Sequence, residues 1–138
     1  MDVRLQHCFL SVDDHEKAIA FYRDALGFEV RNDVKAYGTM RWTTMGPPSQ
    51  PDVSVVLEPP AADPGISDAD REALRDLLAK GLLGRLNLTT ADVDAVFDHV
   101  QATGAEVVQE PMDQAYGVRD CAFRDPAGNL IRINQPRR

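Results

Sequence analysis

The chain has 138 residues and a formal net charge of −7, with 43% hydrophobic and 27% charged residues. This length allows one domain with a substantial core and is too short for two independent ones. No apolar run approaches the roughly 20 residues that span a bilayer. The acidic balance disfavours nucleic-acid binding, because such a surface repels phosphate backbones. The first residues lack the basic and then apolar stretch of a signal peptide, so we expect a cytoplasmic protein without membrane or nucleic-acid partners.

The first half of the chain reads as a strand, a helix and three more strands. Residues 5–12 alternate with period two, as a half-buried strand does. An aspartate at position 13 or 14 can cap the helix that follows, whose apolar residues recur at helical spacing until Gly27. Three more strands are predicted, from residue 28, at 39–44 and at 53–58.

The second half repeats this order of elements. Asp14 matches Asp92 at an offset of 78 residues, whereas Gly27 matches Gly104 at an offset of 77. The change of offset indicates that the second helix has one residue fewer than the first. Modules of this size usually pair, because each sheet needs a partner to bury one face. We therefore predict a single domain made of module one (1–60), a linker helix (61–81) and module two (82–138).

The linker helix carries a narrow apolar stripe made of Leu74, Leu77 and Leu78. Two interpretations remain open. The helix is either an amphipathic connection packed on the body of the domain, or a lid over a ligand cleft.

Two segments carry a resemblance to a known family. Residues 21–28 (FYRDALGF), preceded by Val12-Asp13-Asp14, and residues 123–131 (FRDPAGNLI) resemble the vicinal oxygen chelate superfamily of glyoxalases, bleomycin-resistance proteins and extradiol dioxygenases. The resemblance covers essentially the whole chain. It implies an α+β fold, in which two βαβββ modules with pseudo-two-fold symmetry form a curled mixed sheet around a cleft, commonly within a homodimer. A fold shared by so many activities does not select one of them.

The resemblance also implies a divalent metal held by the first and fourth strands of each module. His7 stands where the first ligand would be, and Arg85 stands at the equivalent place in module two. Arg132 occupies the usual place of a carboxylate, and its counterpart in module one, at an offset of 77, is Val55. Two guanidinium groups have no lone pair to give and would repel a cation.

Glu58 becomes a second candidate ligand if the fourth strand is shifted in this alignment. His7 and at most Glu58 still fall short of the three or four donors that divalent sites need. We therefore predict no metal ligands and no cofactor.

Strand alternation predicts which side chains line the cleft. In each module the apolar residues should face the helix, which places polar and aromatic residues on the opposite face. The residues predicted on that face are His7, Phe9, Arg85, Asn87, Arg132 and Asn134. One hypothesis is that Arg85 and Arg132 receive a carboxylate, a phosphate or a polarised carbonyl. The alternative is an internal salt bridge, such as Arg132 to Glu58, that closes an unused cleft.

Two further aromatic residues are candidates for the site. Trp42 can form the floor of a ligand cleft by stacking, or it can belong to the core or to a dimer interface. Tyr116 lies in a loop that resembles the family's loop bordering the cleft, and a role in stabilising the turn is equally open.

These observations favour a metal-free protein that binds a small anionic or carbonyl-bearing ligand. The alternative from the same superfamily is a lyase, isomerase or dioxygenase, either dependent on a metal or metal-free with His7 as general base. A third interpretation is a module whose dimer surface binds a protein partner. The sequence leaves open whether the protein is an enzyme.

Overall fold

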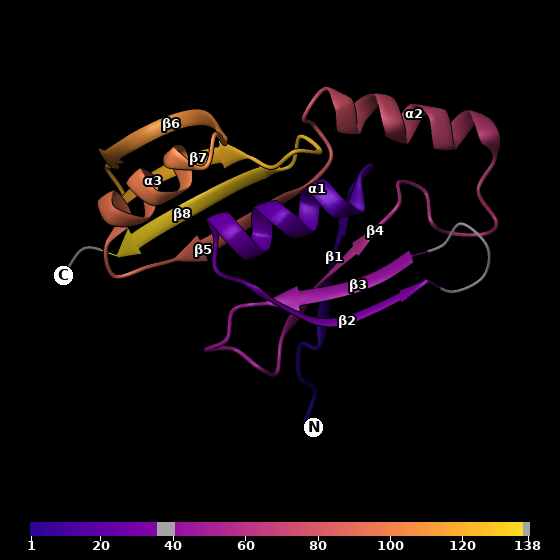
Figure 1. The fold of residues 1–138 in the computed structure, drawn as a ribbon, viewed down its shortest axis with the longest axis horizontal. Helices are drawn as coiled ribbons and strands as arrows, with labels where there is room; N and C mark the ends of the chain where they lie inside the picture. Colours follow the sequence, from indigo (N-terminus) through magenta and orange to yellow (C-terminus); the bar gives the residue numbers. More distant parts are fainter. Residues whose placement is uncertain (36–40, 137–138) are drawn as a thin grey trace.

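The computed structural model describes residues 1–35 and 41–136, and these form two four-stranded sheets with helices between and beside them (Figure 1). The elements are β1 (His7–Ser11), α1 (His15–Ala20), η1 (Phe21–Ala25), β2 (Glu29–Lys35), β3 (Arg41–Gly46), β4 (Ser54–Glu58), α2 (Asp68–Ala79), β5 (Arg85–Thr89), α3 (Val93–Ala102), β6 (Glu106–Asp113), β7 (Val118–Arg124) and β8 (Leu130–Pro136). The predicted α+β fold with two repeated modules is confirmed. Positions 39 and 40 of the predicted third strand lie outside the described residues.

The two sheets share one topology. The first sheet has the strand order β1-β4-β3-β2 and the second has β5-β8-β7-β6. In each sheet the strand before the helix lies at one edge and pairs in parallel with the last strand of its module, as β1 does with β4 and β5 with β8. The other strand pairs are antiparallel. Among the described residues, no helix is both long enough and apolar enough to cross a bilayer.

The pairing register corrects one predicted correspondence between the modules. Phe9 pairs with Val56 in the first sheet, as Asn87 pairs with Arg132 in the second. The counterpart of Arg132 is therefore Val56, at an offset of 76, and the prediction of Val55 was wrong. The cause is the turn before the last strand, which spans residues 47–53 in module one and only 125–129 in module two.

The extra residue predicted in the first helix is accommodated by a change of helix type. Asp14 caps α1 by accepting a hydrogen bond from the backbone N–H of Lys17 at 3.1 Å. After Ala20 the helix widens into the π turn η1, whereas α3 remains α-helical throughout. A π turn places one more residue in a helical turn than an α-helix does, so the helix absorbs the insertion without a break.

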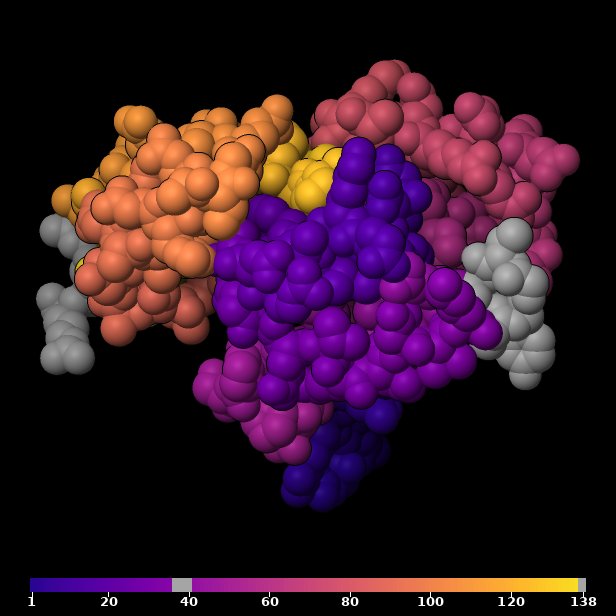
Figure 2. Space-filling view, in the orientation of Figure 1, coloured from indigo at the N-terminus to yellow at the C-terminus, as the bar shows by residue number. Residues whose placement is uncertain are grey.

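The two family signatures meet in the core between the modules. The Tyr22 hydroxyl donates a hydrogen bond of 2.7 Å to Oδ2 of Asp125, and both residues are buried. Asp125 Oδ1 accepts the backbone N–H groups of Ala127, Gly128 and Asn129, each at 2.9 Å. The Asn129 amide in turn donates to the Ser11 carbonyl at 2.8 Å, which ties the β7–β8 turn to the end of β1. Figure 2 shows the first helix (indigo) between module two (orange) and the linker helix.

Gly84 allows this packing, because it lies against the buried Asn129 side chain. A Cβ atom at position 84 would lie 2.5 Å from Asn129 Oδ1 and 3.1 Å from Leu10 Cδ1. We therefore expect Gly84→Ala to lower the free energy of unfolding by about 1–3 kcal/mol, the usual cost of overpacking. Gly65→Ala is the matched control, since a Cβ there meets nothing within 4 Å. Urea unfolding measures both variants, and equal stability of the two would contradict this account.

Candidate functional site

Each sheet turns one face to the helices and leaves the other face uncovered, which we call its free face. Leu10 and Leu57 of the first sheet and Ile131 and Ile133 of the second belong to the buried core. The residues that alternate with them therefore point to the free faces. Phe9, which precedes Leu10 in β1, is one of them, and its exposed fraction is 54%.

The free face of the first sheet carries an aromatic cluster made of His7, Phe9 and Trp42. The ring centroids are 6.4 Å apart for His7 and Phe9, 6.1 Å for His7 and Trp42, and 5.8 Å for Phe9 and Trp42, all with edge-to-face geometry. Aromatic rings favour this arrangement because the positive edge of one meets the negative face of the next. The cluster is a preformed apolar surface on which a planar molecule can stack.

Glu58 lies on the same free face as His7 but at the other end of the strand pair. His7 pairs with Ser54, and Glu58 pairs with Ser11. Four residues along the strands correspond to roughly 13 Å, too far for two side chains that stand perpendicular to the sheet to share one ion. Burial raises the pKa of the Glu58 carboxyl above its usual value.

The free face of the second sheet is polar. Arg85 and Asn87 of β5 are exposed, and Arg132 and Asn134 of β8 are half-buried. Arg132 is the register partner of Asn87, and Asn134 is the register partner of Thr89. The predicted placement of these four residues on one face agrees with the observed register.

A buried carboxylate, Asp120, lies at the centre of this polar face. Its Oδ1 atom accepts hydrogen bonds from Nε2 of Gln109 at 2.7 Å and from Nε2 of Gln114 at 2.9 Å. Its Oδ2 atom accepts from the Tyr116 hydroxyl at 3.1 Å and from Nη1 of Arg132 at 3.3 Å. Nη1 of Arg132 also donates to Oε1 of Gln109 at 2.9 Å. These five side chains form one closed hydrogen-bond network, which we call the Asp120 network.

The Asp120 network keeps its carboxylate ionised. Burial alone would raise the pKa of Asp120, but hydrogen bonds from Gln114, Gln109 and Tyr116 and the charge of Arg132 overcome that effect and lower the pKa. Desolvation and, after it, the hydrogen bond and charge of Asp120 raise the pKa of Tyr116, which therefore remains a donor. Arg132 does form an internal salt bridge, as the alternative interpretation expected, but its partner is Asp120, and the example of Glu58 was wrong.

Sequence reasoning missed Asp120, although one signal was available. The β7–β8 hairpin turns at residues 125–129, and counting outward from this turn pairs Asp120 with Asn134 and Ala122 with Arg132. The count places Asp120 on the same face as Arg132, one register step away. The alternation of β5 and β8 predicts the face of Arg85 and Arg132, and the same alternation in β7 predicts the face of Asp120.

The structure groups the predicted site residues in two places. His7, Phe9 and Trp42 contact one another on the first sheet, whereas Arg132 and Tyr116 belong to the Asp120 network on the second. Among residues 1–35 and 41–136, no hydrogen bond or ion pair joins one free face to the other.

A groove of roughly 750 Å³ lies between the modules beside the edge strand β5. The end of the first helix and the β3–β4 turn form one wall, and β5 and α3 form the other. Asn87 and Asn134 of the second sheet are among the residues that line this groove. Oδ1 of Asn134 is buried without a hydrogen-bond partner among the described residues.

Comparison with known proteins agrees with this architecture. Residues 4–133 match the model of the Glyoxalase/Bleomycin resistance protein/Dioxygenase superfamily. The chain belongs to this superfamily. An uncharacterized protein of Shewanella frigidimarina is 30% identical over 138 residues, which cover 98% of this chain and 95% of that protein.

Two solved structures are similar to nearly the whole chain. The crystal structure of UcmS2 is 36% identical with a TM-score of 0.86, and the match covers 98% of this chain and 99% of that one. TnmS3, an antibiotic binding protein from Streptomyces sp. CB03234, is 31% identical with a TM-score of 0.74. That match covers 98% of this chain and 97% of TnmS3.

The divalent metal implied by the superfamily does not fit the donors of this chain. Two of the four positions are arginines, and Val56, at the first-sheet counterpart of Arg132, has no donor atom. His7 and Glu58 lie at opposite ends of their strand pair. Within the described part of the chain, no three His, Cys, Asp or Glu side chains are close enough together to hold an ion.

The depressed pKa of Asp120 predicts a specific pH dependence of stability. Its ionised form stabilises the fold above the ordinary aspartate pKa of about 3.9, and this contribution is lost as the pH falls through the lower folded-state value. We expect Asp120→Asn to cost about 1–3 kcal/mol at pH 7, because Arg132 and two amide donors lose a charged acceptor. The difference from the wild type should shrink below about pH 4.

Urea unfolding at pH 7, 4 and 3 measures this difference. Asp113→Asn is the control, since Asp113 is 56% exposed and lies 3.5 Å from Arg119. Its effect should be small at every pH. A cost of Asp120→Asn that stays constant down to pH 3 would rule out an ionised carboxylate at this place.

Proposed function

We propose that the protein is a metal-free small-molecule-binding protein of the glyoxalase/bleomycin-resistance type, with an anionic or carbonyl-bearing ligand on the free face of the second sheet. The observation that carries this proposal is the Arg132 guanidinium, which the Asp120 network fixes at the free face with its Nη2 and Nε groups unbonded among the described residues. A planar guanidinium in a fixed orientation suits carbonyl and carboxylate oxygens. A cytoplasmic location and a homodimeric state are parts of this proposal.

The similarity to TnmS3 supports a binding role. TnmS3 is an antibiotic binding protein, and it matches this chain over nearly its whole length at 31% identity. The chain offers the two kinds of surface that small-molecule sites combine, namely aromatic rings for contact area and a few fixed polar groups for orientation. The aromatic cluster supplies the first, and Arg85, Arg132, Asn87 and Asn134 supply the second.

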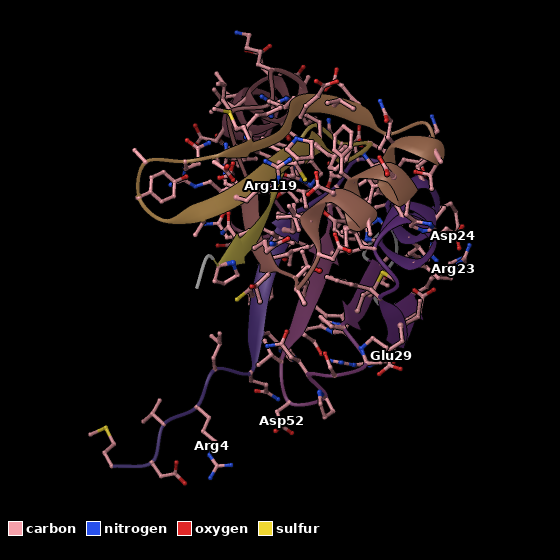
Figure 3. The ribbon with its side chains drawn as sticks, turned by 90° about the vertical axis from the view of Figure 1, so that its left-hand side faces the viewer. Arg4, Arg23, Asp24, Glu29, Asp52 and Arg119 are labelled. Carbon is pink, nitrogen blue, oxygen red and sulfur yellow. The ribbon has the colours of Figure 1, made fainter. Side chains whose placement is uncertain are left out.

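A homodimer would bring these two surfaces together. In one chain they lie on different sheets, so a second copy that places its polar free face against the aromatic cluster completes a cleft. Exposed apolar side chains support an interface, since Val3 and Leu5 are 79% and 62% exposed. Figure 3 shows the first residues, with Arg4, extending away from the body of the domain, where a second copy can bind them.

A thermal-shift screen tests the binding proposal. The panel contains anionic metabolites, aromatic natural products and divalent metal ions. We expect a member of the first two classes to raise the melting temperature by several degrees, because a ligand at about 100 times its Kd stabilises the folded state by about 2.7 kcal/mol. Arg132→Gln and Arg85→Gln should each reduce this shift.

Arg75→Gln is the matched control for the screen, since Arg75 lies on α2 and its side chain is 57% exposed. It should leave the shift unchanged. A hit whose shift survives both sheet substitutions would contradict binding at this face. Stabilisation by a metal ion alone would contradict the metal-free proposal.

The molar mass in solution tests the homodimer. Light scattering should give twice the 15.3 kDa of the single chain. We expect Leu5→Asp to shift the equilibrium to the monomer, because it places a charge among the exposed apolar side chains proposed for the interface. Leu82→Asp is the control, since Leu82 is 71% exposed and lies between α2 and β5, away from the free faces. A monomeric wild type would exclude the proposed cleft.

A further inference from the structure

Asp120 has no hydrogen-bonding capacity left for a ligand. Its side chain is completely buried, and four donors from Gln109, Gln114, Tyr116 and Arg132 share its two oxygens. Burying a carboxylate is costly unless it is hydrogen-bonded, and these four donors offset that cost. Tyr116 is the most exposed member of this network at 69%, and the side chain of Arg132 is 27% exposed.

Arg132 is held by one end of its guanidinium. Both of its hydrogen bonds leave from Nη1, to Gln109 and to Asp120. Its Nη2 and Nε groups make no hydrogen bond with the described residues, so this edge of the fork can donate to a molecule on the free face. The orientation of the fork is therefore set by Gln109 and Asp120 before any ligand arrives.

The carboxylate also changes what Arg132 attracts. An anion at the open edge of the guanidinium would be attracted by Arg132 and repelled by Asp120 behind it, so most of the charge attraction cancels. An uncharged carbonyl oxygen gains the hydrogen bond without that repulsion and has a smaller desolvation cost. Arg85 differs, because it is exposed and has no ion pair among the described residues.

Tyr116 adds a flat surface beside this donor. Its hydroxyl is bound to Oδ2 of Asp120, the same oxygen that accepts from Arg132. The ring is therefore anchored at one end while most of its surface stays exposed. A fixed aromatic face next to a fixed donor suits a planar molecule with a carbonyl group at its edge.

We propose that Asp120 is a positioning residue that makes the Arg132 site select an uncharged, planar, carbonyl-bearing ligand over a carboxylate or a phosphate. This inference rests on the proposed function and narrows the ligand class left open there. Asp120 does not touch the ligand. It acts by orienting Arg132 and Tyr116 and by cancelling the charge of Arg132.

Three probes of one shape test the selectivity: fluorene, 9-fluorenone and fluorene-2-carboxylate. Binding is followed by the amide resonances of Tyr116, β7 and β8 and by the side-chain Nε resonance of Arg132, which lies on this face. The wild type should bind the ketone about fivefold more tightly than the carboxylate, because Asp120 cancels the attraction for the anion. Asp120→Asn should reverse this order, and Arg132→Leu, which removes every donor at this place, should reduce the ketone to the affinity of fluorene.

Asp113→Asn is the matched control, since it removes an exposed carboxylate next to the same strand and should keep the wild-type order. Preference of the wild type for the carboxylate, or an unchanged order in Asp120→Asn, would overturn the inference. If Asp120→Asn does not fold, the wild-type order and Arg132→Leu decide, because a wild-type preference for the carboxylate, or a ketone that still binds Arg132→Leu more tightly than fluorene does, would overturn the inference.

The failure of this inference is distinguishable from failure of the proposed function. Ketone binding that leaves the resonances of Tyr116, β7 and β8 unshifted, or a screen in which only anionic metabolites stabilise the protein through Arg132, would overturn the selectivity and leave the binding role intact. A screen without any ligand dependent on Arg85 or Arg132 would overturn both.

Discussion

The hydrogen bond from Tyr22 to Asp125 is the contact on which the relation between the two modules depends. It is buried and 2.7 Å long, and it joins the two sequence segments that carry the family resemblance. Burial and the neighbouring carboxylate raise the pKa of Tyr22 well above its usual value, so the hydroxyl keeps its proton and its role as donor. Since Asp125 also fixes the β7–β8 turn through three backbone N–H groups, one carboxylate sets both the turn and the position of the first helix against it.

The composition of the site resolves an apparent contradiction of charge. The protein carries a net charge of −7, yet two arginines stand on the free face of its second sheet. The buried Asp120 carboxylate neutralises the charge of Arg132, so this part of the face offers directed hydrogen-bond donors with little net charge. The free face of the first sheet offers aromatic contact area instead. The second sheet thus carries most of the directed donors and the first sheet most of the aromatic contact area, with Tyr116 as the aromatic residue beside Arg132.

Local pattern was sufficient to predict the elements and the face on which each strand residue lies. Alternation alone placed Arg85 with Arg132, and His7 with Phe9, because the side-chain period of a strand does not depend on distant contacts. The partner of Arg132 and the counterpart Val56 required the pairing register, which depends on turn lengths that differ between the modules. Asp120 was missed for a related reason. Its importance comes from four donors on three other segments, and no single segment reveals such a convergence.

The widened turn η1 has a consequence for the symmetry of the molecule. The first helix contains an extra residue, and it is the helix whose Tyr22 reaches across to the turn of module two. The corresponding helix of module two, α3, makes a different contact with module one, between Nε2 of His99 and the Asp24 carbonyl at 3.0 Å. The halves are therefore no longer interchangeable, and a chain rebuilt from two identical copies of either one would lose this junction. Because the two modules make different contacts at their junction, their side chains can differ while both keep the same strand order.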